Sequence, residues 1–112
     1  MRCTITTRET EGVAIFDIAG RMSFPDPLLQ KMVAAQVQEG RKSFVLNFGG
    51  VTYIDSYGLQ DLVTAYNTVK TAAGKMVLLG PIPNVKKTID ITMKGIFEFF
   101  DSEAAAIQAV LP

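Results

Sequence analysis

The run from Phe44 to Phe48 is almost continuously apolar and consists largely of residues that favour β-strands. It makes up most of a predicted strand, Lys42–Phe48, that lacks a clean alternation of apolar and polar residues. A strand with that pattern is typically parallel to its neighbours and covered by helices on both faces. We therefore expect Lys42–Phe48 to be the central strand of an α/β fold.

The rest of the chain alternates predicted strands with predicted helices. Further strands are expected over Cys3–Arg8 and Gly12–Ile18, which form an antiparallel hairpin, and over Lys75–Leu79 and Ile96–Phe100. Helices are expected from Asp26-Pro27 to Gly40, from Ser56 to about Ala73, from Asn84 to Gly95 and from Ser102 through Leu111. The order β-β-α-β-α-β-α-β-α predicts a mixed, mostly parallel five-stranded sheet with about four helices.

Length and composition narrow the class of protein. A chain of 112 residues with 48% hydrophobic content has a common size for one domain, so a single domain is expected over 1–112. Eleven basic residues balance eleven acidic ones, which makes nucleic acid an unexpected partner. No apolar stretch is long enough to span a bilayer, so direct membrane insertion is not expected either.

Cysteine and histidine usage excludes several kinds of chemistry. Cys3 is the single cysteine and the chain has no histidine, which removes an internal disulfide and the usual zinc and iron–sulfur sites. We expect neither a metal nor another cofactor. The start of the sequence lacks the apolar core of a signal peptide, and a reducing cytoplasm is the simplest compartment.

Ser56 stands where the buried strand gives way to a predicted amphipathic helix. Apolar residues downstream recur at helical spacing, at Leu59, Leu62, Val63, Tyr66 and Val69. A hydroxyl at a helix start can cap free backbone N–H groups, or it can carry a phosphate that the helix dipole favours. Spacing alone favours Asp55 or Ser56 as a cap, although Leu59 stands where a capping box would have Glu or Gln.

The sequence does not favour an enzymatic function for this segment, because the residues that would have to act with Ser56 or Asp55 are missing. A catalytic Ser56 would need a base, but the chain has no histidine, and the glycine that precedes the nucleophile in a G-x-S-x-G elbow is missing. Gly49-Gly50 is an isolated pair that we interpret as turn glycines and not as a phosphate loop. A phosphate-accepting Asp55, as in a receiver domain, would need the acidic pair that follows the first strand of such a domain and holds Mg²⁺, and Ile18–Gly20 offers no such pair. Asp55 is therefore expected to hold Ser56 or backbone amides in place.

The segment Val51–Leu59, which reads Val-Thr-Tyr-Ile-Asp-Ser-Tyr-Gly-Leu, resembles the signature of the STAS family, the sulfate-transporter and anti-sigma-factor-antagonist domain. The resemblance covers essentially the whole chain, including Ile18–Arg21, Leu46–Phe48, Val77–Gly80 and the late segment Phe97–Ala106. It implies the STAS fold and a bacterial anti-sigma factor antagonist, which is a binding protein and not an enzyme. In such antagonists the serine matching Ser56 is phosphorylated by a partner anti-sigma factor serine kinase, and the unphosphorylated form sequesters that kinase.

The resemblance also assigns residues. It implies phosphorylation at Ser56 and a partner-binding surface made of Asp55, Ser56, Tyr57, Gly58, Gln60 and Asp61. The chain departs from the family at Tyr57, where Ser or Thr is typical, and at Gln60 and Asp61, where small or apolar residues are typical. It also has Met22-Ser23 where the family often has an acidic residue, and Asp26 is then the substitute for that acid. The alternative is a non-catalytic STAS subunit of a stress-signalling scaffold or lipid-transport complex without phospho-switching. A weak homodimer is compatible with either function.

Overall fold

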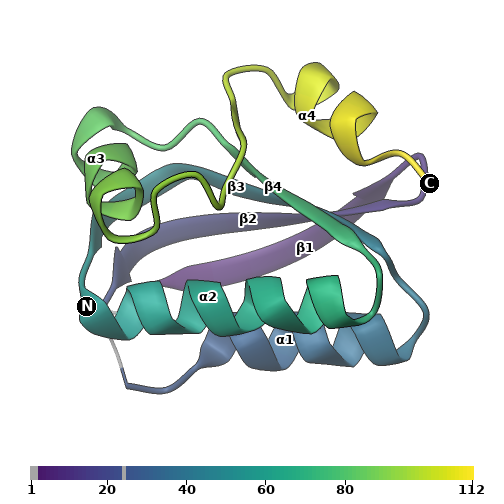
Figure 1. Cartoon of the computed structure of the whole chain (residues 1–112), viewed down its shortest axis with the longest axis horizontal. Helices are drawn as coiled ribbons and strands as arrows, with labels where there is room; N and C mark the ends of the chain where they lie inside the picture. The colour runs from purple at the N-terminus through teal and green to yellow at the C-terminus, as the bar shows by residue number, and fades with distance from the viewer. Residues whose placement is uncertain (1–2, 24) are drawn as a thin grey trace.

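The structure is a computed structural model and describes residues 3–23 and 25–112. Its elements follow the predicted order (Figure 1). They are β1 Thr4–Thr10, β2 Val13–Met22, α1 Leu28–Gln38, β3 Ser43–Ile54, α2 Ser56–Thr71, β4 Lys75–Leu79, α3 Pro83–Thr92, β5 Phe99–Phe100 and α4 Glu103–Val110. The predicted fold class is confirmed.

The sheet has the strand order β1-β2-β3-β4-β5, with β1 antiparallel to β2 and the remaining pairs parallel. Right-handed crossovers that step across a sheet in one direction place their helices on one face. The apolar residues of α1, α2 and α3 accordingly share one core cluster, whereas those of α4 belong to a second. Figure 1 shows α1 and α2 side by side along the sheet, with α4 on the opposite side.

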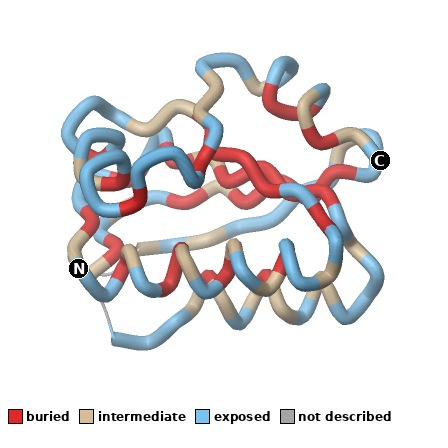
Figure 2. The backbone as a smooth tube through the Cα atoms, in the orientation of Figure 1, coloured by how far each residue is buried: buried red, intermediate tan, exposed pale blue. Residues whose placement is uncertain are grey.

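β3 is the central strand and is buried on both faces, as its continuous apolar run predicts. Phe44 and Leu46 belong to the core cluster beneath α1 and α2, and Val45 between them belongs to the cluster beneath α4. The ring of Phe44 meets that of Phe16 edge to face, with centroids 6.0 Å apart. The buried stretches in Figure 2 follow these inner strands and the facing sides of the helices.

The pair Gly49-Gly50 does not form the turn that the sequence indicates, and this interpretation is wrong. β3 continues through both glycines to Ile54, beside register shifts in β2 on either side of Ala19-Gly20. A Cβ atom at Gly50 would lie 2.9 Å from that of Ala19, so the strands approach too closely there for a side chain. The extension carries the chain to the rim of the sheet immediately before Ser56.

Two helix starts and one strand also differ from expectation. The sequence predicts Asp26 as the N-cap of the first helix, with Pro27 at its first helical position, and Asn84 as the cap of the third. Instead, Pro27 is the N-cap of α1, and Ile82 is the N-cap of α3, with Pro83 at the first helical position. The strand expected over Ile96–Phe100 is reduced to Phe99–Phe100, because the preceding residues close a turn after α3, where the N–H of Ile96 donates to the carbonyl of Met93 at 3.2 Å.

An ion-pair network fastens α4 to the sheet. The Nε of Arg8 donates to Asp17 Oδ2 at 2.7 Å, and its Nη2 donates to Glu103 Oε1 at 2.6 Å. Asn47 adds a hydrogen bond to Asp17 at 2.8 Å. The Arg8 guanidinium lowers the pKa of both carboxyl groups. Over residues 3–23 and 25–112, no helix is both long and apolar enough to cross a bilayer.

Candidate functional site

The junction between β3 and α2 is organised by Asp55, which is the helix cap. Its backbone is extended, with φ −123° and ψ −164°, and its Oδ1 accepts the N–H groups of Tyr57 at 3.0 Å and Gly58 at 3.4 Å. The prediction that Asp55 or Ser56 caps this helix is therefore confirmed for Asp55. The Ser56 hydroxyl does not cap the helix.

Ser56 is the first residue of α2 and is exposed at the rim of the sheet. Its side chain makes no hydrogen bond to any other residue that the structure describes. The hydroxyl is thus exposed to solvent at a helix start whose first N–H groups are capped by Asp55. Added negative charge is tolerated at this position because it lies at the positive end of the helix dipole.

The free energy of unfolding can test whether Asp55, and not Ser56, caps α2. We expect Asp55→Ala to lower the free energy of unfolding by about 1 kcal/mol, because two N–H groups of α2 lose their acceptor. Ser56→Ala should change it by less than about 0.5 kcal/mol, because no intramolecular hydrogen bond is lost. Urea unfolding followed by circular dichroism compares the two variants, and an equal loss in both would contradict the assignment of the cap.

Gly58 is buried and allows α2 to begin directly against the end of β2. A Cβ atom there would lie 2.1 Å from the carbonyl oxygen of Met22 and 2.7 Å from Cγ1 of Ile54. The same carbonyl of Met22 accepts the N–H of Asp55 at 3.3 Å. Gly58 therefore sets the position of the loop that carries Ser56 and presents no side chain to a partner.

Asp61 is buried, with 9% of its surface exposed, and its carboxylate serves α1. Oδ2 accepts the N–H of Leu29 at 3.1 Å, and Oδ1 accepts the N–H of Gln30 at 2.8 Å. The cap position of α1 is occupied by Pro27, which has no side-chain acceptor, so Asp61 supplies the cap from the neighbouring helix. Burial raises the pKa of Asp61 despite these two hydrogen bonds, with the charge of Asp26 acting in the same direction.

The exposed members of the predicted partner surface are Ser56, Tyr57 and Gln60, and Asp55 is half-buried. Tyr57 has 52% of its surface exposed, as a contact residue would. A groove of about 320 Å³ runs between the starts of α1 and α2. It is lined by Pro25, Pro27, Gln30, Tyr57, Gln60, Asp61 and Thr64.

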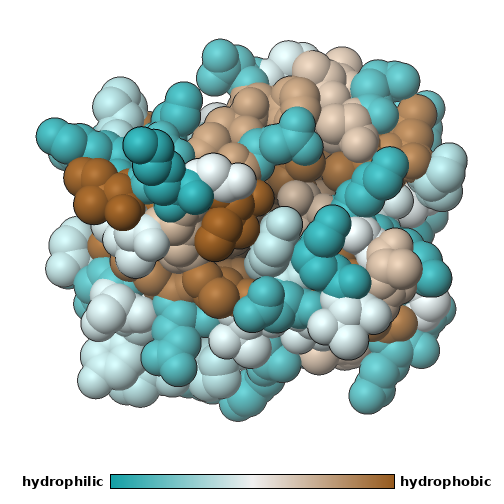
Figure 3. Space-filling view, viewed as in Figure 1, coloured by the Kyte–Doolittle hydropathy of each residue, from teal (hydrophilic) through white to brown (hydrophobic). Residues whose placement is uncertain are grey.

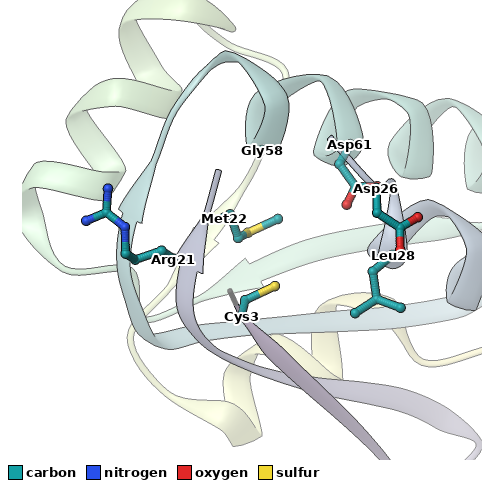
Figure 4. Close-up of a pocket in the computed structure, with 7 residues that line it drawn as sticks. All are labelled: Cys3, Arg21, Met22, Asp26, Leu28, Gly58 and Asp61. Carbon is teal, nitrogen blue, oxygen red and sulfur yellow. The ribbon is translucent and has the colours of Figure 1, made fainter. Parts of the chain in front are cut away.

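A smaller pocket lies under the start of α2 and holds about 20 Å³, which is room for about one water molecule (Figure 4). Figure 4 shows the carboxylates of Asp26 and Asp61 close together on one side and Arg21 pointing away on the other. Among the described residues, no group of three or more His, Cys, Asp or Glu side chains could hold a metal ion.

Arg21 and Tyr53 lie at the same rim of the sheet as Ser56, and the sequence did not predict that they pair. They are opposite each other in the pairing of β2 with β3, and the guanidinium carbon lies 4.1 Å from the centroid of the ring. Tyr53 is 41% exposed. The pair forms because β2 extends beyond Ile18 and β3 extends beyond Phe48. The sequence predicted that the strands end at those two residues, so it did not predict the pair.

Comparison with known proteins agrees with this geometry. The model of the STAS domain family matches residues 4–106. BtrV of Bordetella bronchiseptica, named as a candidate anti-sigma factor antagonist, is 30% identical over 90 residues, which cover 75% of this chain and 76% of BtrV.

Solved structures show the same fold. An anti-sigma factor antagonist from Mycobacterium paratuberculosis has a TM-score of 0.84 at 20% identity, covering 99% of this chain and 96% of the other. The Bacillus cell fate determinant SpoIIAA in its phosphorylated form has a TM-score of 0.71 at 17% identity, covering 95% of this chain and 98% of the other.

Proposed function

The chain belongs to the STAS domain family, and from this premise we propose that it acts as an anti-sigma factor antagonist controlled by phosphorylation of Ser56. In this proposal the unphosphorylated chain binds and sequesters an anti-sigma factor kinase, and phosphorylation releases it. The docking surface includes the exposed residues around Ser56 and the exposed face at the start of α2, with Tyr57 and Gln60 as contacts.

The observation that carries the proposal is the state of the Ser56 hydroxyl. It is exposed and unbonded within the described chain, while Asp55 performs the capping that would otherwise occupy it. Gly58 fixes the junction against Met22, so the hydroxyl is presented on a rigid turn. A kinase can bind such a turn without first disrupting a hydrogen bond.

The chemistry needs only an alcohol from this chain. The kinase would supply ATP, Mg²⁺ and a base; the base takes the proton of the hydroxyl as Ser56 Oγ bonds to the γ-phosphorus and the bond to the ADP oxygen breaks. The product carries about −1.5 to −2 charges at neutral pH. The chain has a formal net charge of zero, so this is a large local change.

Phosphorylation would weaken docking without a change of fold. The phosphate is tolerated at the start of α2 in the free chain, but at a partner surface it must be desolvated or repelled. A penalty of about 3 kcal/mol would weaken binding roughly a hundredfold. The similarity of this fold to a phosphorylated protein, SpoIIAA, supports a switch that keeps its architecture.

The test is phosphorylation by candidate anti-sigma kinases with ATP, followed by mass spectrometry to locate the phosphate. We expect phosphate on Ser56 of the native chain, none on Ser56→Ala, and full incorporation into Ser102→Ala. Ser102 is the matched control because its exposed hydroxyl caps α4 and is remote from Ser56 in the sequence. Calorimetry should then show about a hundredfold weaker binding of the phosphorylated chain to its kinase.

Two results would contradict the proposal. Incorporation that persists at full level in Ser56→Ala would exclude this serine as the acceptor. A stable complex with a transporter or scaffold protein that is unaffected by phosphatase would favour a permanent STAS subunit instead.

A further inference from the structure

Arg21 differs from the other arginines that the structure describes. Arg8 pairs with Asp17 and Glu103, and Arg41 pairs with Glu9. Arg21 has no carboxylate partner among the described residues, and its guanidinium lies over the ring of Tyr53. It is an exposed cation at the same rim of the sheet as Ser56.

The register of the sheet places Arg21 close to the Ser56 loop. It lies opposite Tyr53, at the usual strand separation of about 4.8 Å. Three residues of chain, at most about 10 Å, then lead from Tyr53 to Ser56. The loop is also folded back onto β2, because the N–H of Asp55 donates to the carbonyl of Met22, the residue after Arg21. The backbone positions of Arg21 and Ser56 are therefore at most about 15 Å apart, and Arg21 lines the same small pocket as Gly58, two residues after Ser56.

The neighbouring acids do not compete for Arg21. The carboxylate of Asp55 accepts the amides of α2, and that of Asp61 accepts the amides of α1. Asp26 pairs with Lys31 at 2.8 Å. In Figure 4 the side chain of Arg21 points away from both Asp26 and Asp61. The guanidinium is thus held by an aromatic ring and not by a carboxylate, and it can give up this interaction for a stronger one.

We propose that Arg21 is the internal counter-charge of phosphorylated Ser56, and that the guanidinium leaves the face of Tyr53 to pair with the phosphate. The inference rests on the proposed function, because it needs a phosphate on Ser56. Arginine suits the role because its planar fork binds phosphate oxygens through two parallel hydrogen bonds. Phosphorylation then alters two features of the docking surface at once, because it adds an anion and withdraws the cation over Tyr53.

The test uses the full chain with phosphoserine installed at position 56 during translation, so that no kinase is needed. Titration followed by ³¹P NMR gives the second pKa of the phosphate, which is about 6 for phosphoserine. We expect Arg21→Gln to raise this pKa by about half a unit relative to the native chain, because the dianion loses its counter-charge. Arg21→Lys should retain a large part of the effect.

Arg41→Gln is the matched control. Arg41 precedes β3 at the opposite end of the sheet from Ser56, and its removal should leave the phosphate pKa unchanged. Circular dichroism should show that all three variants keep the native fold, since both arginines are on the surface.

The result that overturns the inference is a phosphate that titrates identically in the native chain and in Arg21→Gln. Such a result would leave Ser56 phosphorylation by a kinase intact. A kinase screen that leaves the native chain unlabelled, combined with a raised phosphate pKa in Arg21→Gln, would instead reject the proposed function and retain the pairing.

Discussion

Gly58→Ala is expected to destabilise the chain by about 3 kcal/mol or more, as measured by urea unfolding. The added Cβ atom would stand 2.1 Å from the backbone oxygen of Met22, and that oxygen cannot move without shifting β2. It would also stand 2.7 Å from Ile54 Cγ1, a buried side chain with little room to turn. The added atom therefore forces α2 away from the end of β2, or it forces β2 and β3 to shift.

The direction of this effect distinguishes close packing from helix propensity. Alanine favours a helix over glycine by about 1 kcal/mol, so a site without the contact would become more stable. Gln60→Ala is the matched control on the same turn of α2, because Gln60 is exposed, and it should change stability by less than about 0.5 kcal/mol. A Gly58→Ala chain as stable as the native one would mean that α2 does not start against Met22.

Gly58→Ala should also impair any event at Ser56. The glycine lies two residues after Ser56 and sets the approach of the loop to β2. A shift of the loop would change the position of the hydroxyl and of the exposed Tyr57 together. We expect slower phosphorylation of the folded fraction, whereas Gln60→Ala should affect partner affinity alone.

The element order and the location of the junction could be predicted from sequence because both depend on local patterns. The apolar run Phe44–Phe48 identifies the central strand, and the helical spacing after Ser56 identifies α2. Asp55 is one of the preferred capping residues and stands directly before that helix. Each of these features is decided within about a dozen residues of chain.

The features that could not be predicted depend on contacts between distant segments. Gly49-Gly50 has the composition of a turn, but β3 continues through it, and Gly50 pairs with Ala19 of β2. An acidic residue such as Asp61 in the first turns of a helix is expected to face solvent and to complement the helix dipole. Its carboxylate instead accepts two N–H groups at the start of α1, about thirty positions earlier in the chain. Pro27, the N-cap residue of α1, has no side-chain acceptor, which indicates that another part of the chain must cap this helix.

Asp61→Ala is expected to lower the free energy of unfolding by about 2 to 3 kcal/mol. The substitution leaves the amides of Leu29 and Gln30 without an acceptor at the partly buried start of α1, and α1 has no side-chain cap of its own. Hydrogen exchange followed by NMR should show faster exchange of these two amides than of those in the middle of α1. Equal exchange throughout α1 would contradict the role of Asp61 as a cap.

Asp61→Asn separates the hydrogen bonds from the charge. Asparagine keeps one acceptor oxygen but places an amide group against the second N–H, so its loss of stability should be smaller than that of Asp61→Ala. The pKa of Asp61 is raised by burial, with Asp26 adding to the shift. A raised folded-state pKa means that the contribution of this carboxyl group to stability is fully present below its unfolded pKa of about 3.9 and is lost as pH rises through the folded value.

The pH dependence therefore gives an independent measurement on the same residue. Between about pH 4 and the raised pKa of Asp61, the stability of the native chain should fall relative to that of Asp61→Asn as pH increases, because only the carboxyl group must lose its proton while buried. Lys31→Gln tests the contribution of the nearby charge, because Asp26 pairs with Lys31 at 2.8 Å and would then act unopposed on Asp61. That variant should show the same fall in stability extending to a higher pH. Parallel stability curves for the native chain and Asp61→Asn over this range would show that the carboxylate of Asp61 is solvated and that α1 is capped in another way.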